Sequence, residues 1–322
     1  TVQISTNFID LNYADDLKEN LKDYSGVNII SGKYEEKIEE LLSNKNGNNV
    51  FLYIDPYGIK ALRCSLFDSF ATGRFNSIEL LINMNSFGFV REACHALGTT
   101  YDDVSVFDDL VEYDSTKLDA SEKSIAELNE IAGGDYWQAI IENYKKKNID
   151  GYEAESQFSE QYSKRLQQSY SYVLNMPLRI KRGQRPKYRM IHATNHKDGC
   201  LLMVDNMCNR WQALQELQTC GQLQLWEENY ENQIIDDDDI ESKVTDHFSI
   251  YRTKISLHEA LASFFTKHGV ICSTGTVKKL IKELENKRCI EIIRCPAKTD
   301  KGRPTAFMDE KRCKKVEVRW LS

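Results

Sequence analysis

The chain has 322 residues, of which 41% are hydrophobic and 28% are charged, and its formal net charge is −7. This composition is typical of a globular protein, and the length predicts two domains. No apolar run approaches the ~20 residues of a membrane helix and no signal peptide opens the chain, so we expect a cytoplasmic protein without a membrane partner. Nine scattered cysteines without a Cys-x-x-Cys pair argue against a zinc site or a disulfide framework.

The first 85 residues alternate between strand and helix patterns. Strands are predicted over residues 2–11, 27–31, 50–54 and 77–84. Helices are predicted between them, over residues 13–24, 33–42 and 61–71. Such alternation is typical of βαβ units with right-handed crossovers. We therefore predict an α/β fold with a parallel sheet at its centre.

The stretch at residues 50–58 carries the clearest functional signal. Its apolar run Val-Phe-Leu-Tyr-Ile predicts a strand buried on both faces, and the turn Asp55, Pro56, Tyr57 and Gly58 follows it. In open α/β sheets, ligands bind at the carboxyl ends of the strands. A rigid proline, an acceptor carboxylate and an aromatic ring in that place suit a flat, amino-bearing substrate beside a cofactor. Catalysis, ligand binding without chemistry, and a purely structural helix cap remain open here.

The middle of the chain changes character. Apolar residues take helical spacing from about residue 100 to 175, which predicts a helical insertion. A strand over residues 187–194 and a helix over residues 200–214 follow it. The acidic run at residues 236–239 is typical of a solvated linker. We assign residues 1–245 to a first domain.

Residues 246–322 form a second predicted domain with the pattern of a winged helix. Helices are predicted over residues 257–267 and 277–286, a strand over residues 287–294, and, after a wing rich in Gly and Pro, returning strands over residues 306–308 and 315–320. Residues 252–322 hold 17 Lys and Arg against 8 Asp and Glu, a net charge of +9. This charge favours an anionic partner, and DNA over RNA. The candidate phosphate contacts are Lys278, Lys279, Lys282, Lys298, Lys301 and Arg303. Neutralisation of the acidic first domain, and a winged helix used for protein contacts, are the alternatives.

Two further polar groups accompany predicted strands. Asn83 ends the strand over residues 77–84, and Arg91 follows it in a position to pair with a phosphate or a carboxylate. The other group, His192, Asn195 and His196, ends the strand over residues 187–194 and either shapes the turn or lines the substrate side of the cleft. Two histidines four residues apart bind metal on a helix face, whereas this segment is strand and turn, so we expect no metal.

Taken in order, these motifs resemble the three-Cys-motif partner protein family (TcmP). The resemblance rests on the Phe-Ile-Asp strand before Asn12, the turn at residues 55–58, the run Leu-Leu-Ile-Asn at residues 80–83 with Arg91 downstream, the run Ile-His-Ala-Thr-Asn-His at residues 191–196, and the winged C-terminus. It implies a Rossmann-like fold similar to S-adenosylmethionine (SAM)-dependent methyltransferases. It also implies a partner protein that carries a three-cysteine cluster and resembles radical-SAM proteins.

The resemblance assigns cofactor contacts as well. Asp10, with Asn12 beside it, would hold the ribose hydroxyls of SAM. Gly32 and Lys33 follow the next strand, where methyltransferases often place an acid; a lysine there accepts no hydrogen bond. The Gly-rich loop and the strand before it would lie ahead of Thr1, and we expect residues to be missing there.

The turn at residues 55–58 also departs from the Asp/Asn-Pro-Pro-Tyr/Phe pattern of amino-methyltransferases, because one proline is absent. In that pattern the first residue binds the target amine and the aromatic ring stacks on a flipped base. The sequence thus predicts a SAM-methyltransferase-like protein that acts on or recognises nucleic acid, with a three-cysteine partner. The alternative is a non-catalytic protein that uses a degenerate methyltransferase fold to dock its partner.

Overall fold

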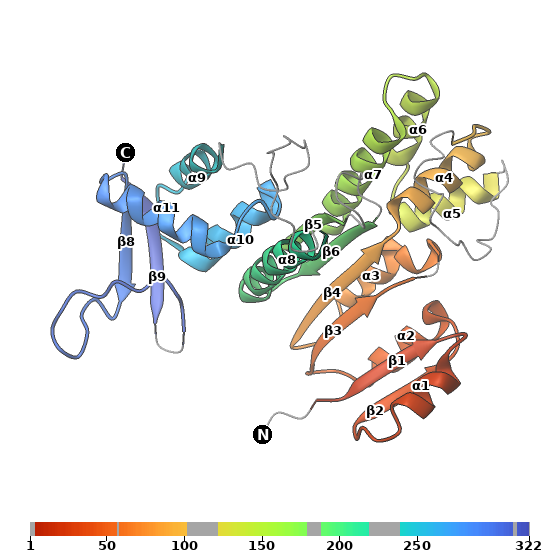
Figure 1. Ribbon diagram of the computed structural model, residues 1–322, viewed down its shortest axis with the longest axis horizontal. Coiled ribbons are helices and arrows are strands. Elements are labelled where there is room, and N and C mark those ends of the chain that lie inside the picture. Colours follow the sequence, from red (N-terminus) through yellow and green to blue (C-terminus); the bar gives the residue numbers. More distant parts are fainter. Residues whose placement is uncertain are drawn as a thin grey trace.

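The computed structural model describes residues 4–56, 58–101, 122–178, 188–218, 239–311 and 314–321, which form a mixed α/β structure (Figure 1). Three sheets are present among these residues: a parallel pair, a mixed four-stranded sheet and an antiparallel three-stranded sheet. Among the helices that the structure describes, none combines the length and apolarity that crossing a bilayer demands.

The N-terminal pair consists of β1 (Thr6–Asp10) and β2 (Val27–Ser31), which run parallel and in register from Thr6 opposite Val27 to Asp10 opposite Ser31. Helix α1 (Ala14–Asn20) connects the two strands, and α2 (Tyr34–Ser43) leads away from β2. Ile38 and Leu42 of α2 are buried, and Tyr34 and Leu41 pack partly buried against the same core. This pair confirms the predicted βαβ unit, because the connection joins two parallel strands.

The four-stranded sheet has the order β3-β4-β6-β5. Its strands are β3 (Asn49–Ile54), β4 (Ser77–Met84), β5 (Tyr172–Leu178) and β6 (Tyr188–Thr194). Strands β3 and β4 are parallel, while β6 is antiparallel to both of its neighbours. The predicted single parallel sheet is therefore wrong in two respects: β1 and β2 form a separate sheet, and β6 runs the opposite way.

Helices cover one face of this sheet and form the larger hydrophobic core. Short helix η1 (Lys60–Leu62), α3 (Cys64–Ala71) and α4 (Ser86–Ala96) follow the parallel strands. The described part of the predicted helical insertion then supplies α5 (Glu122–Ala132), α6 (Tyr136–Lys145) and α7 (Gly151–Leu166). Alternate residues of β4, from Ile78 to Met84, point into this core, as a strand with a period of two requires.

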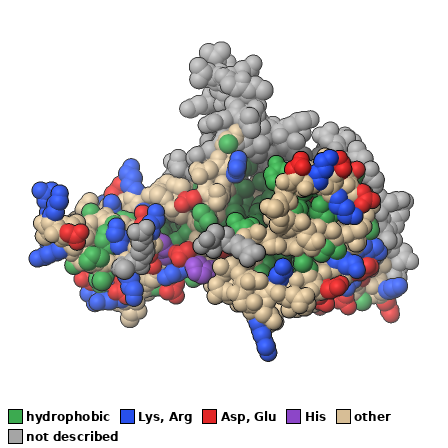
Figure 2. All heavy atoms as spheres, turned by 90° about the horizontal axis from the view of Figure 1, so that it is seen from below, with side chains coloured by type: hydrophobic (Ala, Val, Ile, Leu, Met, Phe, Trp, Pro, Cys, Tyr) green, Lys and Arg blue, Asp and Glu red, His purple; other side chains and the backbone are tan. Residues whose placement is uncertain are grey.

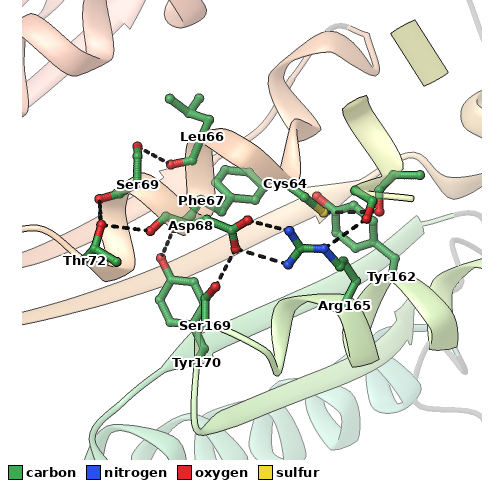
Figure 3. Close-up of polar contacts among 12 residues, drawn as sticks. Cys64, Leu66, Phe67, Asp68, Ser69, Thr72, Tyr162, Arg165, Ser169 and Tyr170 are labelled. Atoms are coloured by element: carbon green, nitrogen blue, oxygen red, sulfur yellow. Dashed lines mark hydrogen bonds and ion pairs between the residues drawn. The ribbon is translucent and has the colours of Figure 1, made fainter. Parts of the chain in front are cut away.

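A polar cluster ties α3 to α7 (Figure 3). The Asp68 carboxylate accepts hydrogen bonds from Arg165 Nη1 at 3.2 Å and from Arg165 Nη2 at 2.5 Å, and a third from Ser169 Oγ. Burial raises the pKa of Asp68, but the hydrogen bonds from Arg165 and Ser169 outweigh it and hold that pKa below its ordinary value. Nearby, the hydroxyls of the fully buried Tyr162 and Tyr170 donate to the backbone of the α3 region. The insertion is thus fixed to the parallel half of the sheet.

The other face of the sheet packs against α8 (Lys197–Gln218) and the C-terminal elements. These elements are α9 (Ile240–Ser249), β7 (Ile255–Ser256), α10 (Leu257–His268), α11 (Thr274–Asn286), β8 (Ile290–Cys295) and β9 (Lys315–Trp320). The small antiparallel sheet has the order β7-β9-β8. Helix α9 contributes Val244 and Phe248 to the shared core, so the expected boundary at residues 245 and 246 falls inside a helix.

Three local predictions differ from the structure. Strand β5 was expected as part of the helical insertion; it is the edge strand of its sheet, where a proline such as Pro177 is tolerated. Strand β3 was expected to be buried on both faces, but Phe51 and Tyr53 are 56% and 54% exposed. Residues 306–308 form no strand.

Candidate functional site

A large cleft opens between β1 and β3, at the side of the molecule seen in Figure 2 as a hollow lined with hydrophobic side chains. Strand β1 lines it from Thr6 to Asp10, β3 lines it from Asn49 to Tyr53, and α2 contributes apolar residues. Its polar end lies where β1, β3 and β4 finish. The sequence-predicted site residues that line the cleft are Asp10, Asp55, Pro56, Gly58, Asn83 and Arg91.

Asp55 lies exposed at the end of β3, with both carboxylate oxygens facing donors. Asn83 Nδ2 donates to Asp55 Oδ1 at 2.9 Å, and the Tyr53 hydroxyl lies 3.4 Å from Asp55 Oδ2. Burial, followed by the negative charge of Asp55, raises the pKa of the Tyr53 phenol, so this phenol stays protonated and able to donate. An ionised carboxylate can accept about four hydrogen bonds, so Asp55 retains capacity to orient an amine. Tyr57 lies outside the described residues.

Asp10 ends β1 and shapes the turn that follows. Its Oδ1 atom accepts hydrogen bonds from the backbone N–H groups of Asn12 at 2.8 Å and Tyr13 at 2.6 Å. Both bonds use the same oxygen, so the turn does not occupy Oδ2. Asn12, Gly32 and Lys33 lie beside this turn rather than among the residues that line the cleft.

Gly32 and Lys33 join β2 to α2. The Gly32 N–H donates to the Asp10 carbonyl at 3.1 Å, which ties the ends of β2 and β1 together. Gly32 has a φ of +146°, a conformation that side chains rarely adopt, so glycine is required at this turn. The Lys33 side chain is 61% exposed and its ammonium lies 4.0 Å from Glu36. Gly32 therefore has a structural role in this turn, and the Lys33 side chain lies largely in solvent.

The N-terminus of α4 closes the polar end of the cleft. Asn85 caps this helix by accepting a hydrogen bond from the Gly88 N–H at 2.8 Å. One turn later Arg91 lies 3.4 Å from Glu92, and both side chains line the cleft. Arg91 is thus paired with a carboxylate, one of the two partners that its sequence position predicted.

His192, Asn195 and His196 lie away from the cleft, toward the opposite end of the strands. Because β6 is antiparallel to β4, its last residue, Thr194, faces Glu79 near the beginning of β4. The His192 side chain is fully buried and its Nε2 atom lies 3.1 Å from Glu79 Oε2. Asn195 Oδ1 accepts from the Ser171 N–H at 2.7 Å.

His196 donates its backbone N–H to Thr194 Oγ1 at 3.0 Å, so this segment forms a turn, which was one of its two expected roles. The other role, lining the substrate side, requires the cleft edge, and none of the three residues is among those that line the cleft. The reversed direction of β6 is the physical reason.

The same reversal brings an unpredicted residue to the site. Tyr188, the first residue of β6, lines the cleft, and burial followed by the charge of Asp55 raises the pKa of its phenol. Tyr53, Asn85 and Glu92 also line the cleft without having been predicted. Tyr188 could have been predicted only if β6 had been assigned as antiparallel to β4. In an antiparallel pair, the first residues of one strand lie beside the last residues of its neighbour.

The predicted phosphate contacts lie on two C-terminal elements. Lys278 Nζ lies 2.5 Å from Asp309 Oδ1, and its side chain is only 18% exposed. Lys279 and Lys282, also on α11, are exposed. The loop between β8 and β9 carries the exposed side chains of Lys298, Lys301 and Arg303. Figure 2 shows Lys and Arg side chains along this end of the molecule.

Within the described ranges, no three His, Cys, Asp or Glu side chains come together in a way that could hold a metal ion. Comparisons with protein-family models, with curated proteins and with solved structures find no match for this chain. The geometry of the cleft and of the basic C-terminal end is therefore what supports a function.

Proposed function

We propose that the cleft binds a nucleoside cofactor of the SAM type and that the protein acts on nucleic acid held by its C-terminal elements. The observation that carries the proposal is the convergence of Asp10, Asp55 and Asn83 in one cleft at the carboxyl ends of β1, β3 and β4, whose arrows point the same way in Figure 1. This is the edge at which α/β sheets bind nucleotides. The fold proposed is Rossmann-like, of the methyltransferase type.

The residues present fit such a cofactor in part. Asp10 Oδ2 would accept from the ribose hydroxyls, while Oδ1 stays bound to its turn. The position after β2, where an acid would contact adenine, holds Lys33, an exposed cation that accepts no hydrogen bond. When bound, SAM supplies an electrophilic methyl group. The chain's own contribution is to orient an amine: Asp55 accepts its hydrogen bonds, and Tyr53 and Asn83 fix that carboxylate.

The C-terminal elements are proposed to be a winged helix that brings the nucleic acid. Helix α11 would be the helix that enters a major groove. Its start is rigid, because Asp205 of α8 accepts hydrogen bonds from the Thr274 N–H at 2.9 Å and from its hydroxyl at 2.8 Å. Lys279, Lys282 and the three basic residues of the β8–β9 loop would contact phosphates. DNA is favoured over RNA because a major groove wide enough for a helix is a feature of B-form DNA.

A second candidate function is a non-catalytic scaffold that docks a partner, with the three-cysteine radical-SAM-like protein as the expected partner. The specific observation in its favour is that Asp10 and Gly32 are both used by turns at the cleft rim. A degenerate site would keep these structural bonds while losing the cofactor.

Calorimetry with SAM separates the two functions. The test compares the protein with its Asp10→Asn variant, which keeps the Oδ1 acceptor for the turn and loses the charge, and with Asp16→Asn on the exposed face of α1 as the matched control. We expect the affinity of the Asp10→Asn variant to fall by about tenfold, or ~1.4 kcal/mol, and that of the control to stay unchanged. Failure of the complete protein to bind SAM would leave the scaffold as the function.

A salt titration of DNA binding tests the C-terminal half of the proposal. Because Lys278 is already paired with Asp309, the informative variant is Lys279→Ala with Lys282→Ala. Each lost phosphate contact should reduce the slope of log K against log salt by about 0.9. Lys123→Ala, on α5, is the control. An unchanged slope in the double variant, or in the triple variant that adds Lys278→Ala, would remove α11 from the nucleic-acid footprint.

A further inference from the structure

Asp309 and Glu310 form an acidic pair in the connection from β8 to β9, which otherwise carries mainly Lys and Arg. Glu310 is fixed by three elements. Its Oε1 atom accepts hydrogen bonds from Ser256 Oγ at 3.0 Å and from the Val316 N–H at 3.3 Å. Lys197 Nζ, at the start of α8, lies 3.4 Å from its Oε2 atom. The Glu310 side chain therefore joins α8, α10 and β9.

The backbone of Glu310 is held as well. Its N–H donates to His258 Nε2 at 3.3 Å, and His258 Nδ1 lies 2.6 Å from Asp198 Oδ1. Because Nε2 accepts in this arrangement, Nδ1 is the ring nitrogen that donates to the Asp198 carboxylate. These contacts fix the chain at residue 310, and they therefore restrict where the neighbouring Asp309 can lie.

Asp309 pairs with a lysine near the start of α11. Lys278 Nζ lies 2.5 Å from Asp309 Oδ1, and the Lys278 side chain is 18% exposed. The hydrogen bond from Lys278 outweighs the effect of burial and lowers the pKa of Asp309, so this carboxylate is ionised at neutral pH. The Asp309 side chain is 55% exposed, so its negative charge also faces solvent.

Lys278 lies at the border of the surface that α11 would present to nucleic acid. Val277 and Ile281 are buried in the C-terminal core, whereas Lys279 and Lys282 are exposed. A lysine at such a border can contact a phosphate beside a groove. A phosphate that approaches Lys278 meets the charge of Asp309 and must compete with it for the ammonium group.

The other ion pairs of the C-terminal elements involve different cations. Glu285 pairs with Arg294, Glu291 with Arg319, and Glu241 with Lys287. None of these three cations is a candidate phosphate contact. Within the described part of the chain, Lys278 is the one candidate phosphate contact that forms an ion pair. Asp309 thus acts on the proposed nucleic-acid surface, whereas the other acids act beside it.

We propose that Asp309 competes with nucleic-acid phosphates for Lys278 and so limits the affinity of α11 for nucleic acid. This inference rests on the proposed function, in which α11 contacts DNA. In the free protein the carboxylate occupies the ammonium group. Lys278 contributes to binding only after a phosphate has replaced Asp309, which makes Asp309 an autoinhibitory contact of the same surface.

Fluorescence anisotropy of the full chain with a labelled DNA duplex at low salt tests the competition. Asp309→Asn keeps the shape of the side chain and removes its charge. Its affinity for DNA should rise about threefold to fivefold, the range that a partly exposed ion pair supports. In a chain that also carries Lys278→Ala, the same substitution should raise affinity by less than about twofold, because the two residues act as a coupled pair. Asp309→Glu retains the charge and should bind DNA like the unaltered protein.

Asp300→Asn is the matched control. It removes the same charge from an exposed position of the β8–β9 loop, so any gain in affinity should be equal with Lys or Ala at position 278. A gain from Asp309→Asn that is likewise independent of position 278 would overturn the competition and leave the proposed DNA binding in place. Absence of DNA binding by the unaltered protein and by every variant would overturn both proposals.

Chemical labelling of lysine amines, followed by mass spectrometry, tests the contact without DNA. In the free protein, Lys278 should react more slowly than Lys279, because its amine is held against a carboxylate and its side chain is largely shielded. Asp309→Asn should raise the rate at Lys278 and leave the rate at Lys279 unchanged. Equal rates at Lys278 before and after the substitution would show that Asp309 does not hold this ammonium group, and would overturn the proposal.

Discussion

The interface between the helical insertion and the sheet differs from the cleft in how its charges are used. At the interface, Arg189 Nε and Nη2 donate to the buried Glu155 carboxylate at 2.8 and 2.7 Å, and Ser86 Oγ donates to the same group. In the cleft, Asp55 is exposed and receives one short hydrogen bond from a side chain. Glu155 is therefore fully paired where helices pack on the sheet, whereas Asp55 stays accessible at the end of its strand.

This difference separates stability from binding. A buried ion pair that loses one partner leaves an uncompensated charge in a poorly solvated site, whereas an exposed carboxylate that is removed is replaced by water. Variants at the interface should thus destabilise the fold, and variants in the cleft should change ligand chemistry alone. The following predictions run from the largest expected effect to the smallest.

The Glu155–Arg189 pair should show the largest effect. Arg189→Met leaves Glu155, whose side chain is 2% exposed, without its cation. We expect the free energy of unfolding, measured by urea denaturation, to fall by about 3–5 kcal/mol. The double variant with Glu155→Met removes both charges and should recover most of this loss. A loss under about 1 kcal/mol in the single variant would show that water reaches the pair.

The Asp68–Arg165 pair is more exposed, with side chains 29% and 20% accessible, so its effect should be smaller. Arg165→Met should lower the free energy of unfolding by about 1–3 kcal/mol, and Lys164→Met on the exposed side of α7 is the control.

The same substitution has a signature in acid. The pKa of Asp68 is below its ordinary value in the folded protein, so its contribution is present above the unfolded value of 3.8 and is lost as pH falls through the folded pKa. Acid unfolding curves of Arg165→Met should show a weaker loss below pH 3.8 than those of the unaltered protein. If the acid unfolding curves of the variant and the unaltered protein were parallel, Ser169 alone would hold the pKa of Asp68 below its ordinary value.

A buried base in the C-terminal core extends the comparison to pH. Burial, together with the nearby His268 and Lys267, lowers the pKa of His247 from 6.5 to about 4. The unfolded chain binds this proton more readily, so stability should fall as pH drops from 6.5 to about 4. In thermal unfolding, His247→Phe should reduce the slope of stability against pH over this range. The control His95→Phe, at an exposed position of α4, should leave that slope unchanged. An equal slope in His247→Phe would assign the pH dependence to other groups.

The cleft should show the smallest effect on stability. Asp55→Ala removes an exposed side chain, so the free energy of unfolding should change by less than about 0.5 kcal/mol. Under the proposed function, transfer of a methyl group to nucleic acid should fall by about a hundredfold or more, because the target amine loses its acceptor. Asp23→Ala, another exposed carboxylate, is the control for both measurements. A large loss of stability would instead assign Asp55 a structural role.

Local periodicity was sufficient for most of the elements. The strands at residues 27–31 and 77–84 coincide with β2 and β4, and the helices predicted at residues 33–42 and 257–267 lie within one residue of α2 and α10. These elements form where hydrophobic spacing and capping agree, and both properties are local. The turn at Asp55 was located at a strand end for the same reason.

Local sequence patterns could not predict which strands pair or in which direction each strand runs. A strand has the same alternation whichever way it runs, so nothing in residues 188–194 marked β6 as antiparallel. That one reversal moved His192 and Asn195 away from the cleft and brought Tyr188 to it. Likewise, the apolar run of β3 predicted burial on two faces, whereas burial depends on which other segments pack there, and in the described structure one face of β3 lies open. Composition and periodicity thus specify which residues form elements, while long-range pairing decides which of their side chains meet.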